Sequence, residues 1–148
     1  MLNKTCFLIG HHDAPESVCP QLDAAIDTHI VEYGVAEFIV GHYGAFDRFA
    51  THVLAEAKRR HPMVTLRLLI PYHPSERFAE LPDGFDGTLY PDGMESVPRR
   101  YAIARANAYI VQRCDYLICY DKYMVGNTHK YANIARRRGV LVTNLAIL

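Results

Sequence analysis

Two glycine-containing turns, each lying between an apolar run and an amphipathic stretch, most constrain how this chain can fold. A Gly-His-His-Asp turn at residues 10–13 follows the apolar residues 5–9, and a second turn at residues 41–47 follows the mostly apolar residues 37–40. A strand, a glycine turn and a helix start, in this order, are typical of α/β proteins. Free backbone N–H groups at such a helix start can bind an anion. Two such turns close together predict a nucleotide-sized pocket.

Hydrophobic periodicity predicts that strands and helices alternate along the chain. Five strands are expected, at residues 5–9, 37–40, 64–70, 115–120 and 140–145. Four helices are expected, with apolar faces within residues 18–33, 46–57, 101–110 and 128–138. For the first helix, Ser17 is expected to cap the start, Pro20 to lie in the first turn and Gly34 to end it in a left-handed conformation.

This alternation predicts a single domain over residues 1–148 with a Rossmann-like three-layer sandwich. Right-handed crossovers restrict a mainly parallel five-stranded sheet to the order 3-2-1-4-5. Ligands of such sheets bind at the carboxyl ends of the strands, where the order reverses. We therefore expect residues 10–13, 41–47 and 121–128 to meet there. Residues 72–98, rich in proline and glycine, are expected to form a long functional loop that covers the pocket, with a short strand at 88–90.

The charge balance argues against binding of duplex nucleic acid. The chain has 16 Lys and Arg against 16 Asp and Glu, whereas duplex-binding domains usually show a basic excess or a basic face. Its basic clusters are residues 58–61, 99–100 and 136–138, and the first and last lie at predicted helix C-termini, where cations complement the helix dipole.

The cysteines and apolar runs predict a cytoplasmic protein. Cys6 and Cys119 lie in apolar strands and are expected to be buried, reduced thiols. The few residues before the first strand are too short for a secretory leader. No apolar run reaches the ~18 residues of a membrane-spanning helix, so no membrane association is expected.

Several short motifs, in order, resemble those of a known superfamily. Residues 38–41, followed by Gly44, Phe46, Asp47 and Ala50, are similar to the "FxVGxxxGFD" signature of SLOG proteins. That superfamily joins the cytokinin-activating LOG phosphoribohydrolases to DNA-processing protein A, and its members share a Rossmann-like fold.

The resemblance extends over most of the chain. Residues 10–13 resemble the "GHR" turn of the family, and residues 90–98 with 100–103 resemble a segment of one small bacterial subfamily. Asn107 matches the asparagine of the "RN" pair in that subfamily, and residues 126–128 occupy the place of its phosphate-binding "GGT" turn. The resemblance implies that the chain binds a nucleotide or a nucleotide derivative. It also implies a homodimer or a higher homo-oligomer.

Three departures from the family pattern bear on chemistry. His12 replaces the arginine of "GHR", and Ala106 replaces that of "RN". Tyr131 stands where LOG enzymes carry the glutamate of PGGxGTxxE. We therefore expect a sensor or ligand-binding module without a cofactor, with nucleotide N-glycosidic hydrolysis as the alternative. In that alternative Glu95 or Asp47 is the general acid or base. Single-strand DNA binding is a third hypothesis, which the neutral charge disfavours.

Each candidate site residue has a functional and a structural interpretation. Gly41 and Gly44 let backbone N–H groups approach a phosphate, or they only serve the turn. Asp47 binds a sugar hydroxyl or a base, or it only caps the helix. Thr128, with its neighbours, binds phosphate at a helix start, or it is an ordinary N-cap. Phe46 stacks on a base or packs in the core.

The remaining candidates lie outside these turns. His11 and His12 are adjacent at a strand end, so their side chains point in opposite directions and no shared metal is expected. Arg100 and Asn107 are seven residues apart and can share one helix face. Glu95 acts in catalysis or pairs with an arginine. The residues expected to bind the ligand are Gly10, His11, His12, Gly41, Gly44, Phe46, Asp47, Arg100, Asn107, Gly126, Asn127 and Thr128.

Overall fold

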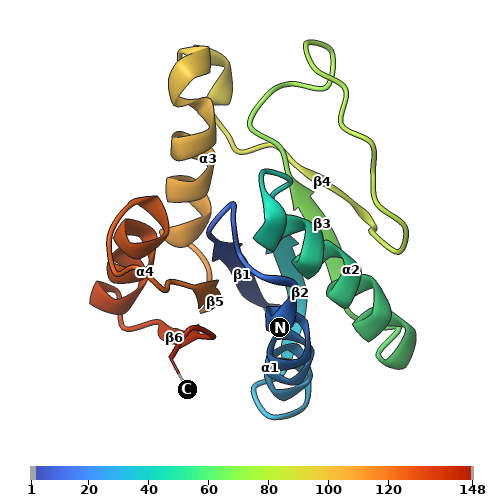
Figure 1. The fold of residues 1–148 in the computed structure, drawn as a ribbon. Helices are drawn as coiled ribbons and strands as arrows, with labels where there is room; N and C mark the ends of the chain where they lie inside the picture. The colour runs from blue at the N-terminus through green and yellow to red at the C-terminus, as the bar shows by residue number, and fades with distance from the viewer. Residues whose placement is uncertain (1–2, 148) are drawn as a thin grey trace.

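A parallel sheet of six strands, in the order β4-β3-β2-β1-β5-β6, runs through the centre of the molecule (Figure 1). The computed structural model describes residues 3–147. The strands are β1 (Lys4–Gly10), β2 (Val35–Val40), β3 (Thr65–Leu69), β4 (Gly87–Leu89), β5 (Tyr116–Tyr120) and β6 (Leu141–Asn144). The predicted α/β class is confirmed, and the predicted order corresponds to β3-β2-β1-β5-β6.

The sheet has one strand more than the predicted five. β4 lies within the segment that was expected to be a long loop, where only a short strand at 88–90 was anticipated. It pairs with β3 alone, from Arg67 opposite Gly87 to Leu69 opposite Leu89. Three residues are too few to give an alternating pattern, so the sequence signal of this strand is weak.

Side chains alternate along each central strand and supply two separate cores. In β1, Cys6 and Leu8 are buried on one face, and Phe7 and Ile9 on the other. The first face packs against α1 (Cys19–Val31) and α2 (Ala45–Arg60), and the second against α3 (Ala102–Val111) and α4 (Asn127–Arg137). Figure 1 shows these two helix pairs on opposite sides of the sheet. This is the predicted three-layer arrangement.

The start of α1 differs from the prediction. A short 3₁₀ helix over Glu16–Val18 precedes it, so Ser17 lies inside a turn and makes no capping hydrogen bond. Pro20 lies in the first turn of α1 as expected, where its missing N–H costs nothing. Gly34 has a φ of 71°, which is the predicted left-handed conformation.

Candidate functional site

A cavity lies at the carboxyl ends of β1, β2 and β3 and holds about 600 Å³ of empty space, its open mouth included. All three turns singled out in the sequence, or the helices that follow them, contribute to it. Its lining residues are Phe7, Leu8, Ile9, Gly10, Gly41, Tyr43, Asp47, Leu69, Pro71, Ile103, Ala106, Asn107, Asn127, Thr128 and Tyr131. Six of these are among the residues expected to bind the ligand, namely Gly10, Gly41, Asp47, Asn107, Asn127 and Thr128.

Asp47 lies in the first turn of α2 and is only 8% exposed. Its Oδ2 accepts a hydrogen bond of 2.9 Å from the backbone N–H of Tyr43, so the carboxylate closes the turn before the helix. Gly41 leaves the space for it, because a Cβ there would lie 3.0 Å from Oδ2. Within residues 3–147 the second oxygen, Oδ1, has no hydrogen-bond partner. Burial raises the pKa of Asp47 to about 7, and the single bond from Tyr43 offsets this only partly.

The start of α4 contributes the second polar region of the cavity. Its N-cap, Gly126, has a φ of 89° and no side chain to cap the helix. In the described part of the chain, the backbone N–H groups of Asn127, Thr128 and His129 therefore stay unpaired. Thr128 is not the N-cap but the second residue of the helix, and it is 6% exposed. Its hydroxyl makes no hydrogen bond to any of residues 3–147.

The charge of the cavity comes from one side chain. No Lys, Arg or His lines it among the described residues, and Asp47 is its single carboxyl group. The unpaired N–H groups of Asn127 and Thr128, both lining residues, add partial positive charge at the start of α4. The remaining lining is largely apolar. The cavity can therefore hold a molecule with one anionic group, several hydrogen-bonding groups and an apolar face.

Three of the residues expected to bind the ligand are used elsewhere. His11 Nε2 accepts a hydrogen bond of 3.0 Å from the backbone N–H of Lys122, and its ring packs 4.8 Å from that of Tyr123. His12 is exposed, and its carbonyl accepts the N–H of Ala45. Phe46 is fully buried in the core. Because none of the three lines the cavity, the histidines do not form its floor and Phe46 cannot stack on a base there.

The expected lid and arginine wall are also absent from the lining. Arg100 lies in the 3₁₀ helix Arg99–Tyr101, is exposed, and places its guanidinium 4.9 Å above the Tyr101 ring. Glu95 is exposed in the 3₁₀ helix Met94–Ser96. No residue of 72–98 lines the cavity, and Pro71 alone reaches it from that side. Glu95 is therefore poorly placed for catalysis in this cavity.

Several lining residues were not predicted from the sequence, although two of them stand at positions that could have pointed to the site. Ala106 and Tyr131 stand at positions where the chain departs from the SLOG-like pattern, and both line the cavity. The Tyr131 hydroxyl donates a hydrogen bond of 3.1 Å to the carbonyl of Ala104, which joins α4 to α3. Tyr43 lies within the turn at residues 41–47 that was expected at the pocket, and Ile103 lies within the SLOG-like segment 100–103, but neither was singled out as a ligand-binding residue.

Two of the turn glycines are required by close packing. A Cβ on Gly10 would lie 2.4 Å from the Phe46 ring, and one on Gly44 would lie 2.6 Å from the backbone Cα of His12. Gly44 also has a φ of 104°, which favours glycine. These contacts bring the turns after β1 and β2 together. Its role in the turn is thus sufficient to explain why glycine stands at position 44, without contact to a phosphate.

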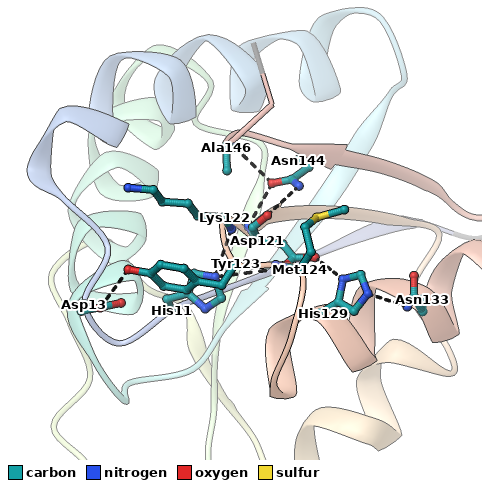
Figure 2. A network of polar contacts seen from close by, with 10 residues as sticks. All are labelled: His11, Asp13, Asp121, Lys122, Tyr123, Met124, His129, Asn133, Asn144 and Ala146. Atoms are coloured by element: carbon teal, nitrogen blue, oxygen red, sulfur yellow. Dashed lines mark hydrogen bonds and ion pairs between the residues drawn. The ribbon is translucent and has the colours of Figure 1, made fainter.

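A polar network beside the cavity fixes the turn that leads into α4 (Figure 2). Asp121 follows β5, and its side chain is fully buried. Its Oδ2 lies 2.7 Å from His129 Nδ1, and its Oδ1 accepts the N–H of Met124 at 3.2 Å. Asn144 accepts the N–H of Asp121 and donates to its carbonyl. The network therefore joins the ends of β5 and β6 to the first turn of α4.

The described residues hold no group of three or more His, Cys, Asp or Glu side chains arranged to bind a metal ion. None of the helices over residues 3–147 is long and apolar enough to cross a bilayer. No protein-family model matches the chain, and no curated protein matches it significantly.

Proposed function

We propose that this protein binds a nucleotide or a nucleotide-derived small molecule in the cavity, as a sensor or ligand-binding module. One observation carries the proposal: two side chains that are more than nine-tenths buried line one cavity and hold hydrogen-bonding atoms without a partner among residues 3–147. They are Asp47 at the start of α2 and Thr128 at the start of α4. Neither Asp47 Oδ1 nor Thr128 Oγ1 is completely enclosed, so each stays accessible and can bond to a ligand. A few convergent polar groups in a largely apolar cavity are typical of small-molecule sites.

The start of α4 suits a phosphate group. The unpaired N–H groups of Asn127 and Thr128 and the hydroxyl of Thr128 provide donors, and the helix dipole favours an anion. The apolar wall of Leu69, Pro71 and Ile103 suits the face of a base. These features support a nucleotide, and the resemblance to SLOG proteins points to the same ligand class.

Two lining positions argue against the hydrolysis that LOG enzymes perform. The resemblance implies an arginine at position 106 and a glutamate at position 131, where this chain has Ala106 and Tyr131. Neither side chain can stabilise a leaving base by charge. The hydroxyl of Tyr131 is already bonded to Ala104.

Nucleotide N-glycosidic hydrolysis stays as a second candidate because of Asp47. It is the carboxyl group within the cavity, and burial raises its pKa to about 7. A carboxyl group with a pKa near the working pH is suited to general acid or base catalysis. This candidate predicts free base released from a nucleotide by the wild type and not by Asp47→Asn.

The surface charges give less support to single-strand DNA binding. Lys58 pairs with Asp86, and Arg60 pairs with Asp23 and Asp27 at 2.8 and 3.0 Å. These acidic partners neutralise the densest basic cluster of the chain. A nucleic-acid groove would instead need free cations along one face.

Calorimetric titration with AMP tests the proposed function. We expect saturable binding of one AMP per chain, and about tenfold weaker binding to Thr128→Val, which loses one hydrogen bond to the phosphate. Thr28→Val is the matched control, because Thr28 is exposed on α1 and bonds only to the Ala24 carbonyl. Equal affinities of the two variants, or no binding of AMP, NAD and ADP-ribose by the wild type, would overturn the proposal.

A further inference from the structure

Asp47 is a buried acid without a positive partner. Its Oδ2 has one donor, the N–H of Tyr43, and its Oδ1 has none within the described residues. No salt bridge reaches it from any of residues 3–147. Inside the cavity the other titratable side chains are the phenols of Tyr43 and Tyr131. Both phenols stay uncharged at neutral pH, because burial raises the pKa of each.

Asp47 also lines a second hollow, on the α2 side. Three titratable or charged side chains line this hollow with it, namely His42, Arg48 and Glu80. His42, Arg48 and Glu80 are all exposed to solvent. From α3 and α4, the lining residues of the main cavity carry no charge. Arg48 thus lines the same hollow as Asp47, but among residues 3–147 no ion pair joins a positive side chain to the Asp47 carboxyl group.

A carboxyl group in this environment changes its protonation when a ligand touches it. Burial disfavours the charged form, which raises the pKa of Asp47 to about 7. A ligand that donates a hydrogen bond to Oδ1 stabilises the carboxylate and lowers that pKa. An anionic ligand group at the same place stabilises the neutral acid and raises it. The direction of the change thus reports which ligand group lies there.

We propose that Asp47 determines the ligand specificity of this cavity. It selects a molecule that presents an uncharged hydrogen-bond donor, such as a sugar hydroxyl or a base amino group, to Oδ1. Binding of that molecule displaces the proton of the Asp47 carboxyl group to solvent. The inference rests on the proposed nucleotide site and specifies the orientation of the nucleotide within it.

The two polar regions of the cavity give the reason for this orientation. The start of α4 presents unpaired backbone N–H donors, which stabilise an anion. The Asp47 region presents an acceptor, and a phosphate beside it would repel the carboxylate. A nucleotide with its phosphate at α4 and its sugar or base toward Asp47 satisfies both regions. The reverse orientation would place the phosphate beside the carboxyl group and would leave the N–H donors of α4 without an anion.

Carbon-13 NMR of the Asp47 carboxyl group tests this directly in the intact protein. The titration midpoint of that carboxyl carbon is measured in the free protein and with saturating AMP, and Asp47→Asn assigns the resonance by removing it. We expect the midpoint to fall by about one pH unit or more when AMP binds. If Asp47→Asn does not fold, Asp47→Glu in protein labelled selectively at aspartate assigns the signal, because this variant keeps the carboxyl group and removes only the labelled Asp47 resonance.

Each outcome separates this inference from the proposed function. A fall of the midpoint on saturation supports both. An unchanged or raised midpoint in a protein that still binds AMP overturns the role of Asp47 and leaves nucleotide binding intact. Failure of AMP, NAD and ADP-ribose to bind the wild-type protein overturns the proposed function, and this inference with it.

Discussion

His129 Nδ1 lies 2.7 Å from Oδ2 of Asp121, whose side chain is fully buried at the carboxyl edge of the sheet. The neighbouring bonds fix the orientation of the ring. Arg136 donates to Oδ1 of Asn133, so the amide nitrogen of Asn133 faces His129 Nε2, at 3.1 Å. In this arrangement Nε2 accepts from Asn133 and Nδ1 donates to Asp121. His129 thus joins the first turn of α4 to the end of β5.

Asp121→Asn is expected to destabilise the protein. The carboxylate accepts from both His129 Nδ1 and the N–H of Met124, and an amide NH₂ group would face one of these donors without an acceptor. Leaving a buried donor unpaired and losing a charge-assisted bond costs about 2–4 kcal/mol. Urea denaturation at pH 7 measures the change. Asp13→Asn is the control, since Asp13 is exposed and its bond to Tyr123 is long at 3.3 Å; equal losses in both variants would contradict the account.

Asp47→Asn is expected to stabilise the ligand-free protein above neutral pH. Below pH 3.8 the carboxyl is protonated in both the folded and the unfolded chain. Between pH 3.8 and about 7 the unfolded chain has lost this proton and the folded chain keeps it, so rising pH lowers the free energy of unfolding. The loss is complete above about pH 7 and amounts to roughly 4 kcal/mol.

The variant lacks this titration, so its advantage over the wild type is expected to be small near pH 4 and full at pH 8. Denaturation curves of both proteins at pH 4, 6 and 8 measure the difference. A difference that stays constant over this range would show that Asp47 has an ordinary pKa in the folded chain.

Gly44→Ala and Gly126→Ala are expected to differ sharply. Both glycines have positive φ and precede a helix. A Cβ on Gly44 would lie 2.6 Å from the backbone of His12, whereas none of the described residues lies within 4 Å of a Cβ on Gly126. Gly126→Ala is expected to cost about 1–2 kcal/mol from backbone strain alone. Gly44→Ala adds a backbone clash and is expected to cost about 3 kcal/mol or more; similar thermal midpoints would refute the packing argument.

Substitutions at three predicted site residues are expected to show which of them contribute to ligand binding in the cavity. Asn107 lines the cavity, while Arg100 and Glu95 are exposed outside it. Asn107→Ala should weaken AMP binding by about five- to tenfold, the effect of one hydrogen bond. Arg100→Ala and Glu95→Gln should leave the affinity unchanged. Calorimetric titration measures the affinity of the three variants for AMP. A loss of affinity in Glu95→Gln would favour the assignment of Glu95 to the site.

The sequence predicted the fold well because its signals are local. Mostly apolar runs marked five strands, and helical periodicity marked four helices. The rule for right-handed crossovers then restricted the topology. β4 was anticipated only weakly, because it has three residues and pairs with a single neighbour. Ser17 was assigned as a cap because a 3₁₀ turn before a helix has no distinct sequence pattern.

The site was predictable only at the level of turns. Gly41, Asp47 and Thr128 lie on elements that the topology brings to one edge, so their convergence follows from the fold. His11 lies on the same edge, yet its ring turns toward Lys122 and Tyr123. The orientation of this ring depends on contacts with residues more than one hundred positions away in sequence, which a local sequence pattern cannot reveal. That Oδ1 of Asp47 has no donor among the described residues likewise depends on distant parts of the chain, so it could not be predicted from the local sequence.

Native mass spectrometry with AMP, NAD, ADP-ribose and cyclic ADP-ribose tests the central proposal most directly. The spectra report the bound mass, the oligomer, which the SLOG resemblance implies to be a dimer or larger, and any released base. We predict one intact nucleotide per chain and no free base. Free base or ribose 5-phosphate that accumulates with time would contradict the binding-module account and make the protein a hydrolase. No adduct with any of the four would contradict nucleotide binding altogether.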